Sequence, residues 1–363
     1  MPAYYRVDVL TASGVLLAEI DNYKEIAYTN TVNAPGVAEI VLHGANTKIQ
    51  YLTENAQVEI YRRNDDFGLD WTRDFVGFLR KEDRKTSRGD DTYIASVIGA
   101  KEILDRRVNA HYAETTNRTI YTSQAVETVM KTLVNTNVGA AAITASGRLR
   151  NGVITGVSIA ANQVRGSGIS WRNAYVNVLD DLQKLANAYS MDFDLNKTGA
   201  NAWQFEVYPS QRGTDRTTTV LFALENGNMT DPVYSYDALE ERTVALIGGD
   251  GEGNARQIVT ISGSGYSALD DREIFIDARN SKGVSAVLTA AGIAALQDNI
   301  PEEKFTFRVL QVPSCYYGVH YFLGDLVKSR YKSQLFTQKI HAVTVRYARD
   351  SGLEDISVRM VSL

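Results

Sequence analysis

Alternating apolar and polar residues predict that the first hundred residues form mainly β-strands. Tyr5, Val7 and Val9 alternate with polar neighbours. Further strand-like runs follow at residues 25–32, 37–42, 56–63, 74–84 and 92–98. Turn-forming residues such as Asn33-Ala34-Pro35-Gly36 separate these runs. Short strands at near-regular spacing, with charged hairpin tips, predict a β-barrel or a β-sandwich.

The middle third of the chain has a pattern that predicts helices as well as strands. A short helix is indicated at 100–107, and a second is expected after Ser123, because apolar residues recur on one face from 126 to 134. The clearest helical periodicity runs from about Ser170, a suitable N-cap, to Ser190. Strand-like runs return at 191–195, 203–208 and 217–222. This stretch predicts a small α+β domain inserted between β modules.

Strand-like alternation returns after about residue 226, with one helix expected near 284–297. The strongest alternation lies at 305–312, 326–331, 336–347 and 355–361. We therefore expect a mainly β fold with an α+β insertion: two related tube-type β-barrel domains plus a smaller mixed domain. The expected domains are 1–107 for the first barrel, 108–230 for the inserted α+β domain and 231–363 for the second barrel, with a helical insertion at about 263–300.

An internal repeat links the two ends of the chain. In the first module, the run 52–60 precedes a charged turn, a long strand through Phe75 and Leu79, a polar hairpin and a terminal strand. In the last module, the run 322–330 precedes the same series of features, with its long strand passing through Phe336. This shared order favours a duplication. Because residue identity between the segments is low, two unrelated meanders remain the alternative.

The motifs of both modules resemble those of the hub proteins of siphophage tail tips. The N-terminal motifs are Pro35-Gly36, Val58-Glu59-Ile60-Tyr61-Arg62, Phe75-Val76-Gly77-Phe78-Leu79 and Ile98-Gly99-Ala100-Lys101-Glu102. Gly324-Asp325-Leu326-Val327 followed by Ile340-His341-Ala342-Val343 resembles the closing module of the same family. These hubs, of the tail-associated-lysin type, are similar to the baseplate hubs of contractile phages and to the hub portion of type VI spike proteins. The resemblance covers most of the chain and is weakest over about 108–230.

The resemblance implies a structural virion protein located at the tail tip and assembled in the cytoplasm of the bacterial host. It implies a homotrimer, in which three chains with two barrels each present six barrel positions to a six-fold tube. The implied partners are the distal tail protein or tail tube protein, the tape-measure protein, and receptor-binding or fibre proteins. Such a hub helps to close the channel, and DNA only passes through its lumen.

Composition narrows the functional class further. The chain has 38 Lys and Arg against 43 Asp and Glu, a net charge of −5, and so lacks the basic excess of duplex-DNA binders. No apolar run approaches the ~18 residues that a membrane span requires, so no stable membrane anchor is expected. The N-terminus lacks the basic and apolar regions of a signal peptide. The single cysteine, Cys315, excludes an intrachain disulfide and is expected to be a small buried hydrophobe.

The sequence indicates no catalytic, cofactor-binding or metal-binding residues, and we expect neither enzyme activity nor a cofactor. The histidines have no metal-ligand partner at i+3 or i+4; they are His43, His111, His320 and His341. The Gly-rich segment 248–254 is expected to be a hairpin loop, because its acidic residues would repel a phosphate. Asp180 and Asp181 are expected on the solvated side of their helix. Six strand residues are either interface anchors or ordinary exposed positions and are assigned to no site: Tyr61, Arg62, Arg80, Arg330, Tyr331 and Arg346.

Two alternative functions remain open. One is a phage-borne hydrolase or carbohydrate-binding adhesin, and the repeat argues against it because an enzyme has no use for two equivalent barrels. The other is the hub of a contractile injection system, which would share the fold.

Overall fold

The computed structural model describes residues 3–87, 90–112, 118–262, 269–279 and 284–362. The N-terminal module consists of β1 (Tyr4–Leu10), β2 (Leu16–Ile20), β3 (Tyr23–Thr31), β4 (Val37–His43), β5 (Gln57–Asn64), β6 (Leu69–Ser87), β7 (Asp90–Gly99) and the short helix α1 (Glu102–Asp105). These strands pair in the order β3-β4-β7-β6-β5-β1-β2, antiparallel throughout. The strands and the helix expected in this region are confirmed.

The C-terminal module repeats this strand order. It consists of β13 (Leu221–Phe222), β14 (Met229–Asp237), β18 (Glu302–Val309), β19 (Leu326–Tyr331), β20 (Gln334–Ala348) and β21 (Leu353–Ser362). These strands pair as β14-β18-β21-β20-β19-β13, and only the short β13–β19 pair is parallel. Strands β14, β18, β21, β20 and β19 therefore take the places of β3, β4, β7, β6 and β5. The internal repeat is visible in the topology.

The correspondence extends to single hydrogen bonds. Asn55 and Gly324, just before β5 and β19, both have a left-handed backbone, with φ of 63° and 89°. The N–H of Asn55 donates to the oxygen of Leu79 at 3.1 Å, and that of Gly324 donates to Ile340 at 2.9 Å. One residue further on, each long strand has a bulge, at Arg80 in β6 and at the equivalent position in β20. Two unrelated meanders would not share this arrangement, so the repeat is structural.

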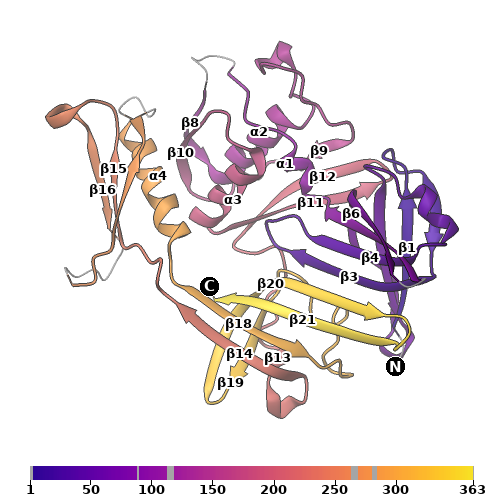
Figure 1. The fold of residues 1–363 in the computed structure, drawn as a ribbon. Helices are drawn as coiled ribbons and strands as arrows, with labels where there is room; N and C mark the ends of the chain where they lie inside the picture. Colours follow the sequence, from indigo (N-terminus) through magenta and orange to yellow (C-terminus); the bar gives the residue numbers. More distant parts are fainter. Residues whose placement is uncertain (1–2, 88–89, 113–117, 263–268, 280–283, 363) are drawn as a thin grey trace.

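Between the modules lies a mixed α+β region (Figure 1). Its elements are β8 (Thr119–Ala125), α2 (Val126–Asn137), β9 (Val157–Ile159), β10 (Gly168–Asn173), α3 (Val178–Ala188), β11 (Met191–Gly199) and β12 (Ala202–Pro209). The predicted helix over 126–134 is confirmed, and its apolar face is buried in the core of this region. Of the strand expected at 217–222, only the last two residues pair, as β13.

The prediction of one helix from Ser170 to Ser190 is wrong at its start. Residues 168–173 form β10, which pairs with β8, and α3 begins only at Val178. Tyr175 has φ of 57°, which breaks a helix, and the Asn177 side chain caps α3 by accepting from the N–H groups of Leu179 and Asp180. Trp171 alternates with polar residues as well as it fits a helical stripe, so apolar periodicity alone could not separate the strand from the helix.

A second insertion separates β14 from β18, at the place of the β3–β4 turn. It contains β15 (Val244–Gly248), β16 (Ile258–Ser262), β17 (Glu273–Asp277) and α4 (Ser285–Asp298). The helix expected near 284–297 is confirmed. The Gly-rich segment connects β15 and β16, as expected for a hairpin loop. A Cβ on Gly292 would lie 2.6 Å from the Ile247 side chain, so glycine lets α4 approach β15 closely.

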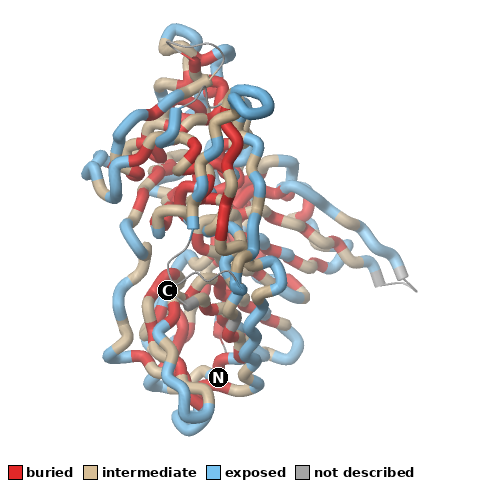
Figure 2. The backbone as a smooth tube through the Cα atoms, turned by 90° about the vertical axis from the view of Figure 1, so that its left-hand side faces the viewer, coloured by how far each residue is buried: buried red, intermediate tan, exposed pale blue. Residues whose placement is uncertain are grey.

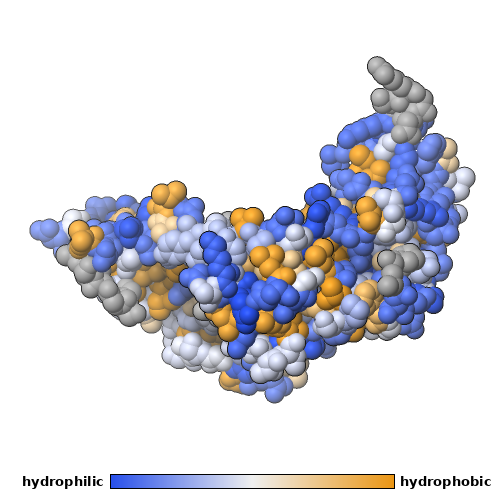
Figure 3. All heavy atoms as spheres, turned by 90° about the horizontal axis from the view of Figure 1, so that it is seen from below, coloured by the Kyte–Doolittle hydropathy of each residue, from blue (hydrophilic) through white to orange (hydrophobic). Residues whose placement is uncertain are grey.

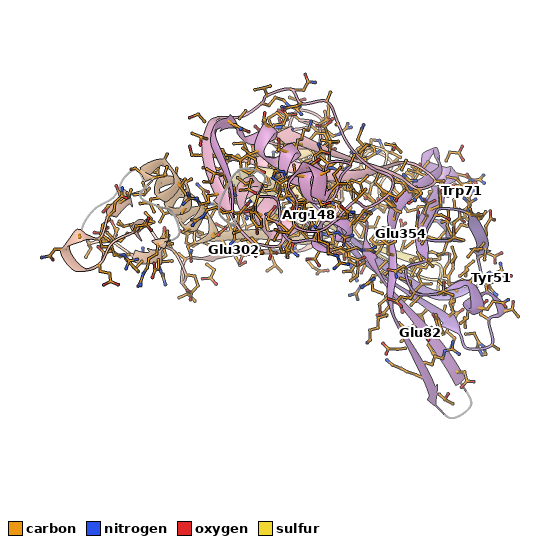
Figure 4. All side chains as sticks on the ribbon, turned by 90° about the horizontal axis from the view of Figure 1, so that it is seen from above. Tyr51, Trp71, Glu82, Arg148, Glu302 and Glu354 are labelled. Carbon is orange, nitrogen blue, oxygen red and sulfur yellow. The ribbon has the colours of Figure 1, made fainter. Side chains whose placement is uncertain are left out.

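The whole molecule is a curved body with projections at its two ends. Seen from above, the second insertion, with β15, β16, β17 and α4, extends at one end. The β6–β7 hairpin projects at the other end (Figure 4). The tube view shows this hairpin as an exposed projection from a buried core (Figure 2). The fold is mainly β, as expected, but the strand pairs of the described residues form an open path and not a closed barrel. None of the helices in the described ranges has the length and hydrophobicity of a transmembrane helix.

Candidate functional site: the junction between the terminal modules

The two terminal modules meet along β3 and β20. The antiparallel pairing runs from Ala342 opposite Thr31 to Ala348 opposite Glu25. Near its middle, the hydroxyl oxygens of Thr29 and Thr344 lie 2.8 Å apart. Because a backbone ladder fixes both distance and direction, the modules are held in one relative orientation.

A buried arginine also connects the modules. Arg62, on β5, is 1% exposed, donates to the backbone oxygen of Tyr317 at 2.5 Å, and lies 3.4 Å from Asp74 and 3.5 Å from Glu354. The hydroxyls of Tyr28 and Tyr317 donate to Asp74 at 2.5 and 3.0 Å. Glu354 and Tyr317 come from the C-terminal module and the other three residues from the N-terminal module. The buried guanidinium therefore pairs with one carboxylate from each module across the junction.

Burial changes how these groups titrate. Burial alone would lower the pKa of Arg62, but the carboxylate of Asp74 and its other acidic neighbours hold that pKa well above the usual arginine value. Burial and the nearby Glu354 raise the pKa of Tyr5, while burial and Asp74 raise that of Tyr28. The arginine therefore stays charged and the tyrosines stay neutral hydrogen-bond donors across the physiological pH range.

One hydrophobic core runs through both terminal modules. It contains residues from β1 to β7 together with residues from β13, β14 and β18 to β21. Aromatic pairs span the junction: the rings of Tyr5 and Tyr347 lie 4.7 Å apart, and those of Phe67 and Tyr316 stack at 4.1 Å. The modules therefore form a single rigid unit, since separating them would expose this shared core.

The middle region is fixed to both modules by buried ion pairs. Lys197, on β11, lies 2.6 Å from Glu59 of the N-terminal module. Lys339, on β20 of the C-terminal module, lies 2.8 Å from Asp192. Asn33 donates to the backbone oxygen of Met191 at 3.1 Å. The α+β region thus braces the junction from its side.

The strands equivalent to β3 and β20 each have an edge that is unpaired in the described residues. β14 corresponds to β3, yet in the described residues it pairs only with β18. β6 corresponds to β20, and its pairing with β5 ends at Phe78, so residues 81–87 pair only with β7. Tyr28 on β3 is 2% exposed, whereas the equivalent Tyr234 on β14 is 38% exposed. The chain thus contains a second copy of each junction strand, β14 for β3 and β6 for β20. In the described residues, these two copies do not pair with each other.

No group of three or more His, Cys, Asp or Glu among the described residues is arranged to hold a metal ion. Cys315 is buried, as expected, and burial raises the pKa of its thiol to about 11.

The expectation for Asp181 is wrong. Its side chain is buried and accepts hydrogen bonds from Trp171 and Asn109, both at 3.0 Å. The donors come from β10 and from a distant segment, so the helical pattern around Asp181 contains no sign of them. Asp180, by contrast, is exposed as expected.

Sequence reasoning left Arg62 undecided, although one signal was present. In a strand, residues i and i+2 share a face, and Arg62 follows Val58 and Ile60 at this spacing. Both apolar residues are fully buried, and Arg62 lies on their face. An arginine in phase with a buried apolar row indicates a buried ion pair. Arg80, another of the undecided residues, lies 3.2 Å from Glu102 and remains partly exposed.

Comparison with known proteins identifies the family. The sequence model described as Siphovirus ReqiPepy6 Gp37-like protein matches residues 6–359. No curated protein matches the chain. Among solved structures, the chain is similar to the tail protein from Neisseria meningitidis MC58, with 11% identity over 99% of this chain and 97% of that chain and a TM-score of 0.59.

Two further structures share the fold. The 43 kDa tail protein of prophage MuSo2 from Shewanella oneidensis is 10% identical over 100% of this chain and 98% of that chain, with a TM-score of 0.60. The Francisella PdpA-VgrG complex is 8% identical over 99% of this chain and 58% of that chain, with a TM-score of 0.53. At these identities the likeness is one of fold. The chain belongs to the Siphovirus ReqiPepy6 Gp37-like protein family.

Proposed function

We propose that this protein is the homotrimeric hub of the tail tip, which joins the six-fold tail tube or distal tail ring to the tip and helps to close the DNA channel. The observation that carries the proposal is the repeated module. The junction between the two copies is head-to-tail, because it uses β3 of one and β20 of the other. A head-to-tail interface does not close on itself, so further modules can add at each end until a ring forms.

Three chains would supply the six module positions that a six-fold tube requires. Each module would act as a tube-type barrel segment whose sheet is completed by its neighbours in the ring. The division at residues 107 and 230 belongs to this proposal, although β13 and the first residues of β14, before 231, already pair with C-terminal strands. The rigid shared core suits such a role, since a ring segment must keep its curvature under load.

The proposed partners follow from this position. The tube-facing side would contact the distal tail protein or tail tube protein, and the opposite side the tape-measure protein and the receptor-binding or fibre proteins. DNA would only pass through the lumen, in keeping with a net charge of −5. Assembly would take place in the host cytoplasm, and no catalytic step is assigned to the chain.

Light scattering after size-exclusion chromatography tests the proposal. The purified protein is measured alone and mixed with the distal tail protein. In at least the mixture, we expect a particle that contains three copies of this chain. A monomer in both conditions would contradict the hub. Release of sugar or peptide from host cell walls by the purified chain would instead support the hydrolase alternative.

The Francisella complex shares the fold, so a contractile injection system remains the alternative with the same architecture. The two differ in what surrounds the hub. Purified virions with a non-contractile tail that contain this protein would support the siphophage role.

A further inference from the structure

We propose that residues 81–87 of β6, here called the β6 arm, add to the free edge of β14 in the next chain, in the register that β20 adopts on β3. This inference rests on the trimeric hub proposed above and names the surface that closes it. The β6 arm lies in the projecting hairpin, where Glu82 marks its position (Figure 4). Glu302, opposite the end of β14, lies well away along the molecule in the same view. The arm therefore cannot reach its own β14.

The register follows from the repeat. The bulges of β6 and β20 align Lys81 with Ala342 and Asp83 with Thr344. The ladders from β20 through β21 and β18 likewise align Ser235 of β14 with Thr29 of β3. Transferring the β3–β20 pairing to the equivalent strands gives the pairs between chains. They are Lys81 opposite Asp237, Glu82 opposite Tyr236, Asp83 opposite Ser235, Arg84 opposite Tyr234 and Lys85 opposite Val233.

The chemistry of both edges fits these pairs. Lys81 and Asp237 carry opposite charges. Asp83 can accept from the Ser235 hydroxyl at the position where the β3–β20 junction has its threonine pair. On β14, Val233 and Tyr236 are 58% and 60% exposed, so the free edge carries exposed apolar side chains. Figure 3 shows further hydrophobic patches on the face that carries β13, β14 and β19. A covering strand would bury the β14 residues.

Both edges also have the features of a contact that forms late. In the β3–β20 junction, β20 contributes Val343 and Val345, both fully buried. The equivalent positions in the β6 arm are the exposed residues Glu82 and Arg84. Charged residues and proline on a free edge both discourage indiscriminate strand pairing before assembly. Pro232 has no N–H group and would end the ladder just beyond Val233. The charges of the β6 arm thus discourage nonspecific strand pairing before assembly. The proline limits the β6 arm to one stretch of β14 during assembly.

Paired cysteines test the register. In a Cys315→Ser background, Asp83→Cys with Ser235→Cys places thiols at the pair equivalent to Thr29 and Thr344, where side chains approach closely. Thr29→Cys with Thr344→Cys is the control within one chain. Lys85→Cys with Ser235→Cys is the control with the register displaced by two residues. Under mild oxidation in the presence of the distal tail protein, we expect covalent dimers and trimers from the first variant only.

A second test uses the charges. Lys81→Asp alone should weaken trimer formation roughly two- to fivefold per contact, and adding Asp237→Lys should restore it. Trimers by light scattering, with neither crosslinks in the Asp83→Cys, Ser235→Cys variant nor charge rescue, would overturn the arm while leaving the hub intact. Failure of the unmodified protein to form trimers would overturn the hub and the arm together.

Discussion

At the scale of single residues, Arg62 decides whether the module junction holds. Removing its guanidinium leaves Asp74 and Glu354 without a cation in a buried site. Uncompensated buried charges cost about 3–5 kcal/mol, so Arg62→Met should lower the free energy of unfolding by that amount. Urea unfolding measures the change.

Arg63 is the matched control for this prediction. It is the next residue of β5, and its pair with Asp65 is exposed on both sides. Arg63→Met should change stability by no more than about 0.5 kcal/mol. If the two variants unfolded at the same urea concentration, the buried network would have no special role in the junction.

Glu127 gives the middle region a pH dependence of known sign. Burial alone would raise its pKa, but hydrogen bonds from Arg165 and Lys131 lower it to about 2. A carboxyl group with a lowered folded pKa stabilises the protein above its unfolded value, about 4.5, and this contribution is lost as the pH falls toward 2. Wild type should therefore exceed Glu127→Gln in stability by on the order of 2 kcal/mol at pH 6 and lose most of that advantage near pH 2.

Chemical unfolding of both proteins across this pH range measures the difference. An advantage that stays constant from pH 6 to pH 2 would show that the charge of Glu127 is not what stabilises the fold.

At the scale of elements, the turns before β5 and β19 carry the repeated geometry. Gly324 has φ of 89°, and a Cβ there would lie 2.4 Å from the Arg212 side chain. Gly324→Ala should therefore cost more than the about 1–2 kcal/mol of left-handed strain alone. Gly352→Ala has the same kind of strain in open space and is the control.

Thermal unfolding compares these variants. We expect Gly324→Ala to melt lowest, Gly352→Ala to be intermediate, and Asn55→Gly to stay within about 0.5 kcal/mol of wild type, because glycine accepts the same backbone angle. Equal melting of the two alanine variants would show that Gly324 is not crowded.

The elements also show how far the sequence alone predicts the structure. Residues such as Val58 and Val345 alternate with polar neighbours, so the strands and their repetition could be predicted. The start of α3 could not, because Trp171 suits a strand face and a helical stripe equally. The environment of Asp181 could not either, since Asn109, one of its donors, lies 72 residues away in the sequence.

At the scale of the whole molecule, the junction itself lies beyond what patterns can predict. Thr29 and Thr344 face each other across 315 positions, and nothing local to either strand indicates the other. Once the junction is known, however, the repeat predicts its second occurrence between chains. The sequence indicates the repeat, and the structure shows how the two copies pair along β3 and β20.

The arrangement of modules in the assembled particle tests the central claim most directly. Electron cryomicroscopy of the protein with the distal tail protein should show three chains whose six terminal modules follow one another at about 60° around one axis. The contact between chains should repeat the β3–β20 contact within each chain. A ring in which only one module of each chain lines the channel, or a particle without three-fold symmetry, would contradict the account.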